Sequence, residues 1–421
     1  MNKLRSSMLL TASLIGFALT ARCQTDTLHL DFKQAEGLFL KNNLSLLAQK
    51  YNVEATQALI QQAKLWDNPT LSTDQNIHDG NGKFFDHSNG NGQLYAQLTQ
   101  LFKTAGKRGK EIQVAKDDAQ IQQAEFNDLL RNLHYNLLLD FAQLSNLIEQ
   151  SKIYTGEISS VNNLISGVSK SYDVGNSSLK DVIRLKALLY GLENDLVENS
   201  RQLNDLQSQL KTLLATSQNA YIVPQMETRI SDQPLDANAL IEKAKANRGD
   251  YLSNQYQYNQ AGHKLALQKA LAVPDVTVGV EYDQHSSYAP NYVGLTVGLP
   301  LPLFNRNQGN IKSAKSTIQS LQATYKNSEM QLNNDVVSAI QQYHLSTQLL
   351  SKNETDFYQQ YDNLFNNMFK AYKQRQLSLV EFIDFFDSYK DTKLKVINQQ
   401  YNLQKAIADL NFSVGATVIN P

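Results

Sequence analysis

Proline is confined to a few places in this chain, and its distribution limits the possible folds more than any other feature. The sequence has 421 residues and eight prolines, at positions 69, 224, 234, 274, 290, 300, 302 and 421. Two tracts, 103–223 and 303–420, contain no proline. Because proline disrupts a helix interior, tracts of this length permit helices much longer than the ~11 residues typical of globular domains.

The second proline-free tract carries apolar residues at alternating spacings of three and four. They are Ile311, Ala314, Ile318, Leu321 and Tyr325, followed by Leu332, Val336, Ala339 and Tyr343. This spacing is typical of a coiled-coil seam. If 308–372 forms one helix, it is roughly 100 Å long at ~1.5 Å per residue.

Two segments before this tract alternate with a period of two. In 274–284 one face collects Val276, Val278, Val280 and Tyr282, and in 291–301 every odd position from 293 onward is aliphatic. The less regular segments 69–79 and 92–102 precede the first tract. We therefore expect four strands of about ten residues, a length that fits a half-buried sheet or a membrane barrel.

Four strands cannot close a membrane barrel, because the smallest barrels have about eight. An open sheet in lipid would leave its edge amides without partners. If these strands cross a bilayer, several chains must share one barrel, and three chains would supply about twelve strands.

The two halves of the chain repeat one pattern. Five residues recur at an offset of 205: Asn42, Leu47, Tyr51, Lys64 and Pro69 correspond to Asn247, Leu252, Tyr256, Lys269 and Pro274. Five more recur at an offset of 200: Lys170, Tyr172, Ser178, Leu179 and Ile183 correspond to Lys370, Tyr372, Ser378, Leu379 and Ile383. We interpret this as a duplication. The first repeat covers 24–222, a linker follows at 223–238, and the second repeat covers 239–421.

Residues 1–23 have the features of a signal peptide. Lys3 and Arg5 precede an apolar segment that is too short to span a bilayer as a helix. The only cysteine, Cys23, is either removed with the signal or becomes the lipid-bearing first residue of the mature chain. After residue 24 no apolar run is long enough for a transmembrane helix.

Composition and motifs give no indication of an enzyme. The formal net charge is −1, so nothing points to nucleic acid. There is no HExxH, GxSxG or P-loop motif, and no carboxylate pair is set apart as acid and base. We expect no catalytic residue, no cofactor and no resident metal.

A glycine-rich segment, Asp79–Gly92, resembles a calcium loop in composition. Lys83 and Phe85 stand where that loop needs oxygen ligands. We interpret the segment as a hairpin loop, and the nearby histidines as solvated side chains rather than metal ligands: His78, His87 and His285.

Each proline-free tract is interrupted by a short polar segment, "YDVGNSSLKDVI" or "YKQRQLSLVEFI". Gly175 suits a helix end, and a serine at 177 or 178 suits the next N-cap. Asp181 and Glu381 then fall in a first helical turn, where the helix dipole favours an acid. The alternative is that symmetry copies of Asp181, Glu381 and Asp384 form acidic rings that narrow a pore and select cations.

Together, the duplicated helix–strand–strand–helix unit, the turn "LPLPLFNRNQGNIKSAK" and the two helix breaks resemble the TolC family of outer-membrane efflux channels. The resemblance covers essentially the whole mature chain. It implies a mainly α fold with a membrane β-barrel portion. In such a fold a homotrimer forms a twelve-stranded barrel in the outer membrane of a Gram-negative bacterium, continued by a long α-helical barrel in the periplasm.

The resemblance also implies partners and cargo. A periplasmic adaptor protein and an inner-membrane transporter of the RND class would be the partners, together with outer-membrane lipid. A heavy-metal branch of the family is similar in length to this chain. Five methionines and one cysteine offer few soft ligands for copper(I), and the cargo stays open.

By position, the resemblance assigns three acids to the family's tip: Asp181, Glu381 and Asp384. Tyr172 and Tyr372 match the tyrosine before each break. Gly175 matches the tip glycine, which Arg375 replaces in the second half. Leu377 stands where the family has a basic residue that holds the tip closed, and Arg375 and Arg184 are the candidates to replace it.

The double proline marks the expected joint between the last strand and the helix, at Pro300, Pro302 and Phe304. The prolines end sheet pairing because they have no amide to donate. In the first half, Gly106 and Gly109 are expected to provide the corresponding bend. Our leading hypothesis is a passive export duct; the alternative is a secreted or periplasmic coiled-coil scaffold without channel activity.

Overall fold

The computed structural model of the chain describes residues 26–78, 83–85, 92–226, 234–351 and 355–420. The expected signal peptide with Cys23 lies outside these residues, as do His87, most of the 79–92 loop and part of the 223–238 linker. Within the described ranges, no helix is both long enough and apolar enough to cross a membrane.

The chain divides into two compact units. The first unit is drawn from Met1–Leu47, Leu129–Ala244 and Asn334–Pro421, and the second from Ala48–Asp128 and Lys245–Asn333. Each unit therefore takes segments from both expected repeats. Neither repeat forms a compact unit by itself, because its helices pass from one unit into the other.

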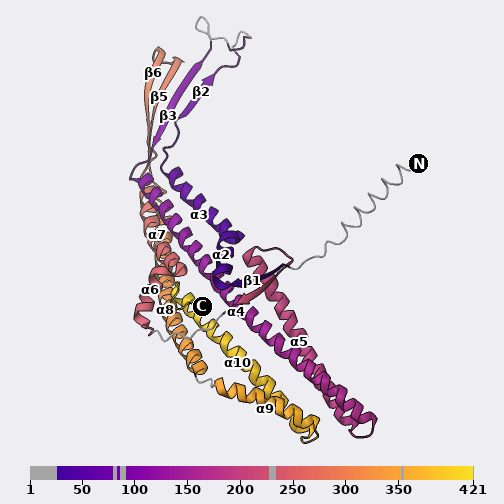
Figure 1. The fold of residues 1–421 in the computed structure, drawn as a ribbon. Coiled ribbons are helices and arrows are strands. Elements are labelled where there is room, and N and C mark those ends of the chain that lie inside the picture. Colours follow the sequence, from indigo (N-terminus) through magenta and orange to yellow (C-terminus); the bar gives the residue numbers. More distant parts are fainter. Residues whose placement is uncertain (1–25, 79–82, 86–91, 227–233, 352–354, 421) are drawn as a thin grey trace, which may run out of the picture. The chain divides into compact units, whose positions relative to one another are not determined.

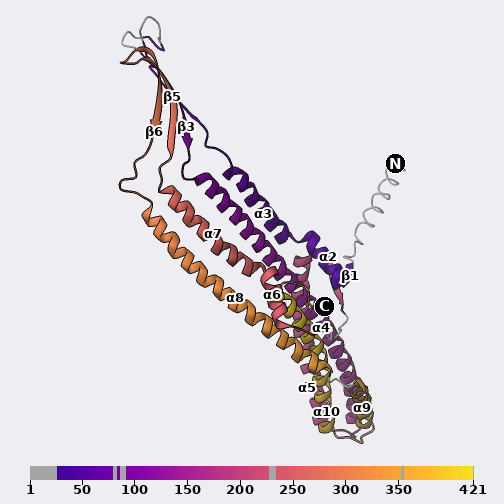
Figure 2. The ribbon, with the colours of Figure 1, turned by 90° about the vertical axis from the view of Figure 1, so that its left-hand side faces the viewer.

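A four-stranded antiparallel sheet belongs to the second unit (Figures 1 and 2). Its strands are β2 (Thr70–Gln75), β3 (Leu94–Phe102), β5 (Val276–His285) and β6 (Pro290–Gly298), in the order β2-β3-β5-β6. Strands β3 and β5 join the two halves of the sequence, with Tyr95 opposite Asp283 and Phe102 opposite Val276.

All four strands occur where the alternating segments are, and two of them end earlier than expected. Strand β2 ends at Gln75, and β6 ends at Gly298 rather than at residue 301. Pro300 explains the end of β6, because its nitrogen has no hydrogen to donate to a neighbouring strand.

The helices of the second unit pack closely at α7 (Gly249–Leu271). Gly249 is buried against the backbone of α4 (Lys107–Asp173) near Ala124 and Asp128. Further along α7, the Tyr251 and Tyr325 hydroxyls lie 2.7 Å apart, and the Tyr258 ring stacks on Tyr325. Tyr325 belongs to α8 (Gln308–Ser351).

The first proline-free tract forms the single 67-residue helix α4, followed by α5 (Leu179–Leu214). The second tract forms α8, α9 (Thr355–Lys373) and α10 (Leu379–Val414). The helix considered for 308–372 is therefore described as α8 and α9, with 352–354 outside the described residues. Shorter helices complete the chain: α2 (Phe32–Asn42), α3 (Leu44–Ala63) and α6 (Ala237–Asn247).

A two-stranded parallel sheet in the first unit was not predicted. Strand β1 (Asp26–Asp31) pairs with β4 (Ala220–Gln225), and β4 overlaps the start of the expected linker. The Gln207 side chain donates to the Ile222 carbonyl (2.6 Å) and accepts from the Ile222 amide (3.0 Å). The pairing of β1 with β4 joins segments far apart in the sequence, so no local pattern predicts it.

Candidate functional site

The two helix breaks have the same backbone geometry. In the first, Gly175 has a φ of +74° and donates to the Tyr172 carbonyl (2.8 Å), while Asn176 donates to Ser171 (2.8 Å). In the second, Arg375 has a φ of +60° and donates to Tyr372 (3.0 Å). This pattern is that of a Schellman C-cap, which favours glycine. Arg375 therefore occupies a glycine-type position.

The helices after the breaks begin with serine caps. Ser178 Oγ accepts from the Asp181 amide (3.1 Å), and Ser378 Oγ accepts from the Glu381 amide (3.3 Å). The Glu381 carboxylate in turn accepts from the Ser378 amide (3.0 Å) and hydroxyl (2.6 Å). These bonds lower the pKa of Glu381. The expected capping role of Glu381 is thus filled by a complete capping box.

A hydrophobic cluster holds the helices beside the breaks together in the first unit. Its buried members come from α4, α5 and α10: Val161, Leu164, Leu185, Leu192, Leu379, Phe382 and Phe386. Aromatic rings of α9 pack against it, and Phe365 stacks on Tyr389 with ring centroids 4.1 Å apart. Figure 1 shows α9 and α10 side by side in this region.

The two tyrosines that precede the breaks lie in different surroundings. Tyr172 is exposed, whereas Tyr372 is half-buried and stacks on Phe382 at 5.0 Å. Burial, with a contribution from the Asp181 carboxylate, raises the pKa of Tyr372 to about 12. The sequence match of these tyrosines therefore does not extend to their environment.

A groove of about 620 Å³ lies between the two breaks, and several of the expected site residues line it: Asp181, Arg184, Tyr372 and Arg375. Arg375 Nη2 donates to Ser171 Oγ (2.5 Å), which links one break to the other. Gly175, Glu381 and Asp384 do not belong to this lining. Asp384 is exposed on α10.

The sheet of the second unit has a polar face connected by hydrogen bonds. The Tyr95 hydroxyl donates to Glu281 Oε2 (2.9 Å), and Gln97 Nε2 donates to Glu281 Oε2 and to Thr296 Oγ1 (both 3.3 Å). Gly279 lies on the same face, where an added Cβ would come within 2.8 Å of Thr99 Cγ2. The register thus brings polar and small residues of three strands together.

The opposite face of this sheet is aliphatic and exposed. Leu98 lies across from Val280, and Val280 lies across from Leu295. Leu295 is 74% exposed, and Val280, Val293 and Val297 are also more than half exposed. In water an aliphatic sheet face of this kind is unfavourable, so this face requires an apolar environment.

The joint after β6 exposes its apolar residues. Phe304 is 92% exposed, and Pro300 and Pro302 lie outside the sheet. The corresponding bend in the first half is at Ala105 and Gly106, both with positive φ. Gly109 is inside α4, so its expected role in the bend was wrong: Gly106 already supplies the left-handed residue, and the helix begins at Lys107.

An ion pair at the first-half bend escaped the sequence analysis. Lys107 Nζ donates to Asp275 Oδ1 and to the Val273 carbonyl (both 2.6 Å), and the Thr104 amide donates to Asp275 Oδ1 (2.8 Å). The Lys107 side chain is almost fully buried. These bonds tie the start of α4 to the start of β5. No sequence signal joins residues so far apart.

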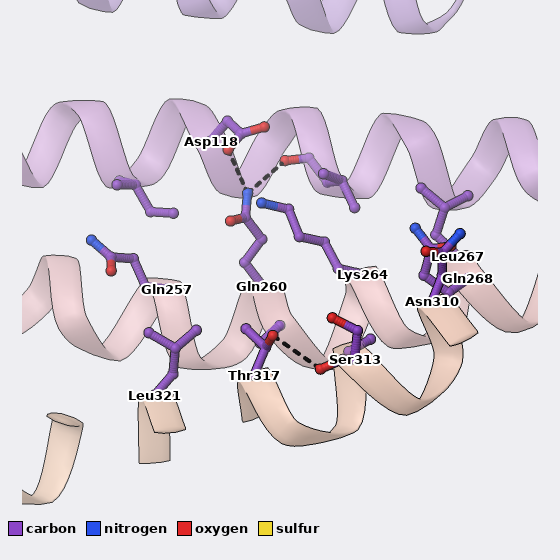
Figure 3. A pocket seen from close by; sticks show the side chains of 14 residues that line it. Asp118, Gln257, Gln260, Lys264, Leu267, Gln268, Asn310, Ser313, Thr317 and Leu321 are labelled. Atoms are coloured by element: carbon purple, nitrogen blue, oxygen red, sulfur yellow. Dashed lines mark hydrogen bonds between the residues drawn. The ribbon is translucent and has the colours of Figure 1, made fainter. Parts of the chain in front are cut away.

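The second unit also contains a groove of about 680 Å³ between α4, α7 and α8 (Figure 3). Gln260 Nε2 projects across it and donates to Asp118 Oδ1 (2.6 Å) and to the Val114 carbonyl (3.3 Å). The rest of the lining mixes neutral polar and apolar side chains, together with the cationic Lys264. Across the described part of the chain, no three His, Cys, Asp or Glu side chains are grouped to hold a metal ion.

Long paired helices, paired helix breaks and a sheet with one polar and one exposed aliphatic face define an outer-membrane channel subunit. The outer membrane efflux protein family model matches residues 37–216 and 240–416. The chain belongs to this family, which confirms the resemblance seen in the sequence. Members of the family serve as efflux ducts rather than as enzymes.

Two relatives and a solved structure specify this likeness. The cobalt-zinc-cadmium resistance protein CzcC of Cupriavidus metallidurans is 22% identical over 75% of this chain and 73% of its own length. The nickel-cobalt-cadmium resistance protein NccC of Alcaligenes xylosoxydans xylosoxydans is 22% identical over 81% and 77%. The CusC crystal structure matches with a TM-score of 0.74 and 14% identity, over 91% of this chain and 92% of that one.

Proposed function

We propose that this chain is the outer-membrane exit duct of a tripartite efflux system that exports divalent metal cations. The observation that carries the proposal is the two-faced sheet of β2, β3, β5 and β6. Its exposed aliphatic face suits lipid and its hydrogen-bonded polar face suits a water-filled lumen.

The duct is a homotrimer in this proposal. Four strands per chain are too few to close a barrel in the membrane, and three chains supply about twelve. The helices that follow the joints extend into the periplasm as an α-helical barrel. There the tip meets a periplasmic adaptor, and the adaptor connects the duct to an inner-membrane RND transporter.

The proposed cargo rests on the two metal-resistance relatives and on the charge of the tip. Asp181 lines the groove between the two breaks, and Asp384 is exposed on α10. In a trimer, three copies of each carboxylate would surround the exit path and favour cations. Glu381 is less suited to this role, because its carboxylate is occupied by the capping box.

We further propose that Arg375 replaces the basic residue missing at Leu377. Its bond to Ser171 joins the two breaks within one chain, so it restrains the tip without a partner from another subunit. The equal backbone geometry of the breaks at an offset of 200 supports the proposed duplication of 24–222 and 239–421.

The test replaces Asp181 by Ala and measures single-channel currents of the purified protein in planar bilayers. We expect D181A to lower the preference for cations over anions by roughly twofold, because a ring of like charges at a constriction sets the local ion concentration. Asp205→Ala is the matched control, since it removes an exposed acid from the same helix α5, away from the break. Unchanged conductance and selectivity in D181A would limit Asp181 to its place at the helix start.

A further inference from the structure

A buried glutamate lies in the first unit where α4 packs against α5 and α10. We call this packing surface the seam. Glu157 is on α4, seven residues after Gln150 and seven before Leu164, so these three residues recur on one side of the helix. Gln150 belongs to a hydrogen-bonded polar layer with Asn146, Asn199 and Asn398. Leu164 belongs to the hydrophobic cluster. Glu157 therefore lies between a hydrogen-bonded polar layer and an apolar one.

The carboxyl group of Glu157 forms no hydrogen bond with any side chain or backbone group in the described ranges. The residue is 5% exposed, and both carboxyl oxygens are buried without a hydrogen-bond partner in the described part of the chain. An ionised carboxylate in such a place costs several kcal/mol unless it is paired. A protonated carboxyl avoids most of that cost.

The groups that face Glu157 are mostly acidic. Helix α5 contributes Asp195. Helix α10 contributes Asp387, Lys390 and Asp391, together with the hydroxyl of Tyr389. Tyr154 lies one turn away on α4 itself. Lys390 is shared, because its Nζ is 3.8 Å from Asp195. On α9, Asp362 is bonded to Tyr389 and to Lys393. An ionised Glu157 would thus add a like charge to a cluster with too few cations.

We propose that Glu157 is a proton-operated switch: the neutral carboxyl lets α4 pack against α5 and α10, and opening of this seam releases the proton. Burial raises the pKa of Glu157 to about 8, with Lys390 opposing and the aspartates adding to the rise. A carboxyl released into water returns to about 4.3. The closed seam then binds more protons than the open one between these two values, so rising pH favours opening.

With Glu157 as a switch, the packing of α4 against α5 and α10 depends on pH. Acidification holds the seam closed, and a rise in pH from about 5 to about 8 loosens it. The switch depends on packing within this chain and not on its partners or cargo. It can therefore fail while the proposed function holds, and the reverse.

The test is hydrogen exchange with mass spectrometry on the full chain in detergent micelles, from about pH 5 to about pH 8. After correction for the intrinsic pH dependence, we expect exchange in peptides around 154–164 and 382–391 to rise about tenfold per pH unit, the linkage limit for one proton. Glu157→Gln, which mimics the neutral acid, should exchange slowly and without this pH dependence. Glu193→Gln, an exposed acid on α5, should behave like the unmodified chain.

Two results would overturn the proposal. One is a corrected exchange rate in the unmodified chain that does not change with pH. The other is an E157Q variant that keeps the pH dependence of the unmodified chain. If E157Q does not fold, Glu157→Leu tests the same point, because an apolar side chain also removes the titrating group while preserving burial. Slow, pH-independent exchange in E157L supports the proposal, and pH-dependent exchange opposes it.

Discussion

At the scale of single residues, glycines of one helix differ sharply in what surrounds them. Gly249 begins α7 within van der Waals reach of the α4 backbone, where an added Cβ would lie 2.5 Å from the Asp128 nitrogen. Gly262 lies in the same helix, and no atom of another described element lies within 4 Å of an added Cβ. The sequence presents both as helical glycines, and only packing separates them.

These two glycines give a matched prediction. Gly249→Ala should lower the free energy of unfolding by about 1–3 kcal/mol, because the methyl group forces the two helix backbones apart. Gly262→Ala should be neutral or raise it by up to about 1 kcal/mol, because alanine has the higher helix propensity. Thermal unfolding of both variants in detergent measures the difference. Equal effects of both substitutions would show that α7 does not approach α4 this closely.

At the scale of elements, the sheet depends on strict alternation. Val276, Val278 and Val280 point to the aliphatic face, and Thr277 points to the polar one, as the register requires. These faces are predictable from the sequence because a period of two needs no knowledge of the neighbouring strands. The polar groups that bond across the strands are not predictable in this way, since their contacts depend on the pairing of β3 with β5.

This alternation predicts the tolerance of β5 to charge. Val278→Arg should prevent assembly into the membrane, because an arginine on a lipid face costs about 2–4 kcal/mol near the bilayer centre. Thr277→Arg should assemble, because its side chain shares a face with Glu281. Heat-resistant oligomer in isolated outer membranes is the measurement. Comparable assembly of the two variants would mean that the valine face does not meet lipid.

The helix breaks are a second case at this scale. Gly175 and the serine cap were readable from the sequence, because Schellman ends and N-caps depend on local residues. Arg375 in a glycine-type conformation was not, and neither was its bond to Ser171. Both depend on how α4 and α9 end beside each other in the first unit.

At the scale of the whole molecule, oligomerisation is the decisive property. Native mass spectrometry of detergent-extracted protein should give three chains per particle, because each chain supplies four strands and a closed barrel needs more. The exposed apolar stretch at Leu301, Leu303 and Phe304 is expected to become buried on assembly or in lipid. A stable monomer, or recovery of the protein as a soluble periplasmic species, would contradict the trimeric duct.

The sequence by itself determined the long helices, the four alternating strands, the positions of the breaks and the family, because these follow from local periodicity and from proline and glycine placement. Tertiary structure decided the β1–β4 pair, the Lys107–Asp275 ion pair, the separate environments of Tyr172 and Tyr372, and the burial of Glu157 among aspartates. The physical reason is the distance along the chain over which each effect acts. Backbone propensity acts over a few residues, whereas the charge and solvation of a side chain depend on segments brought together from hundreds of residues away.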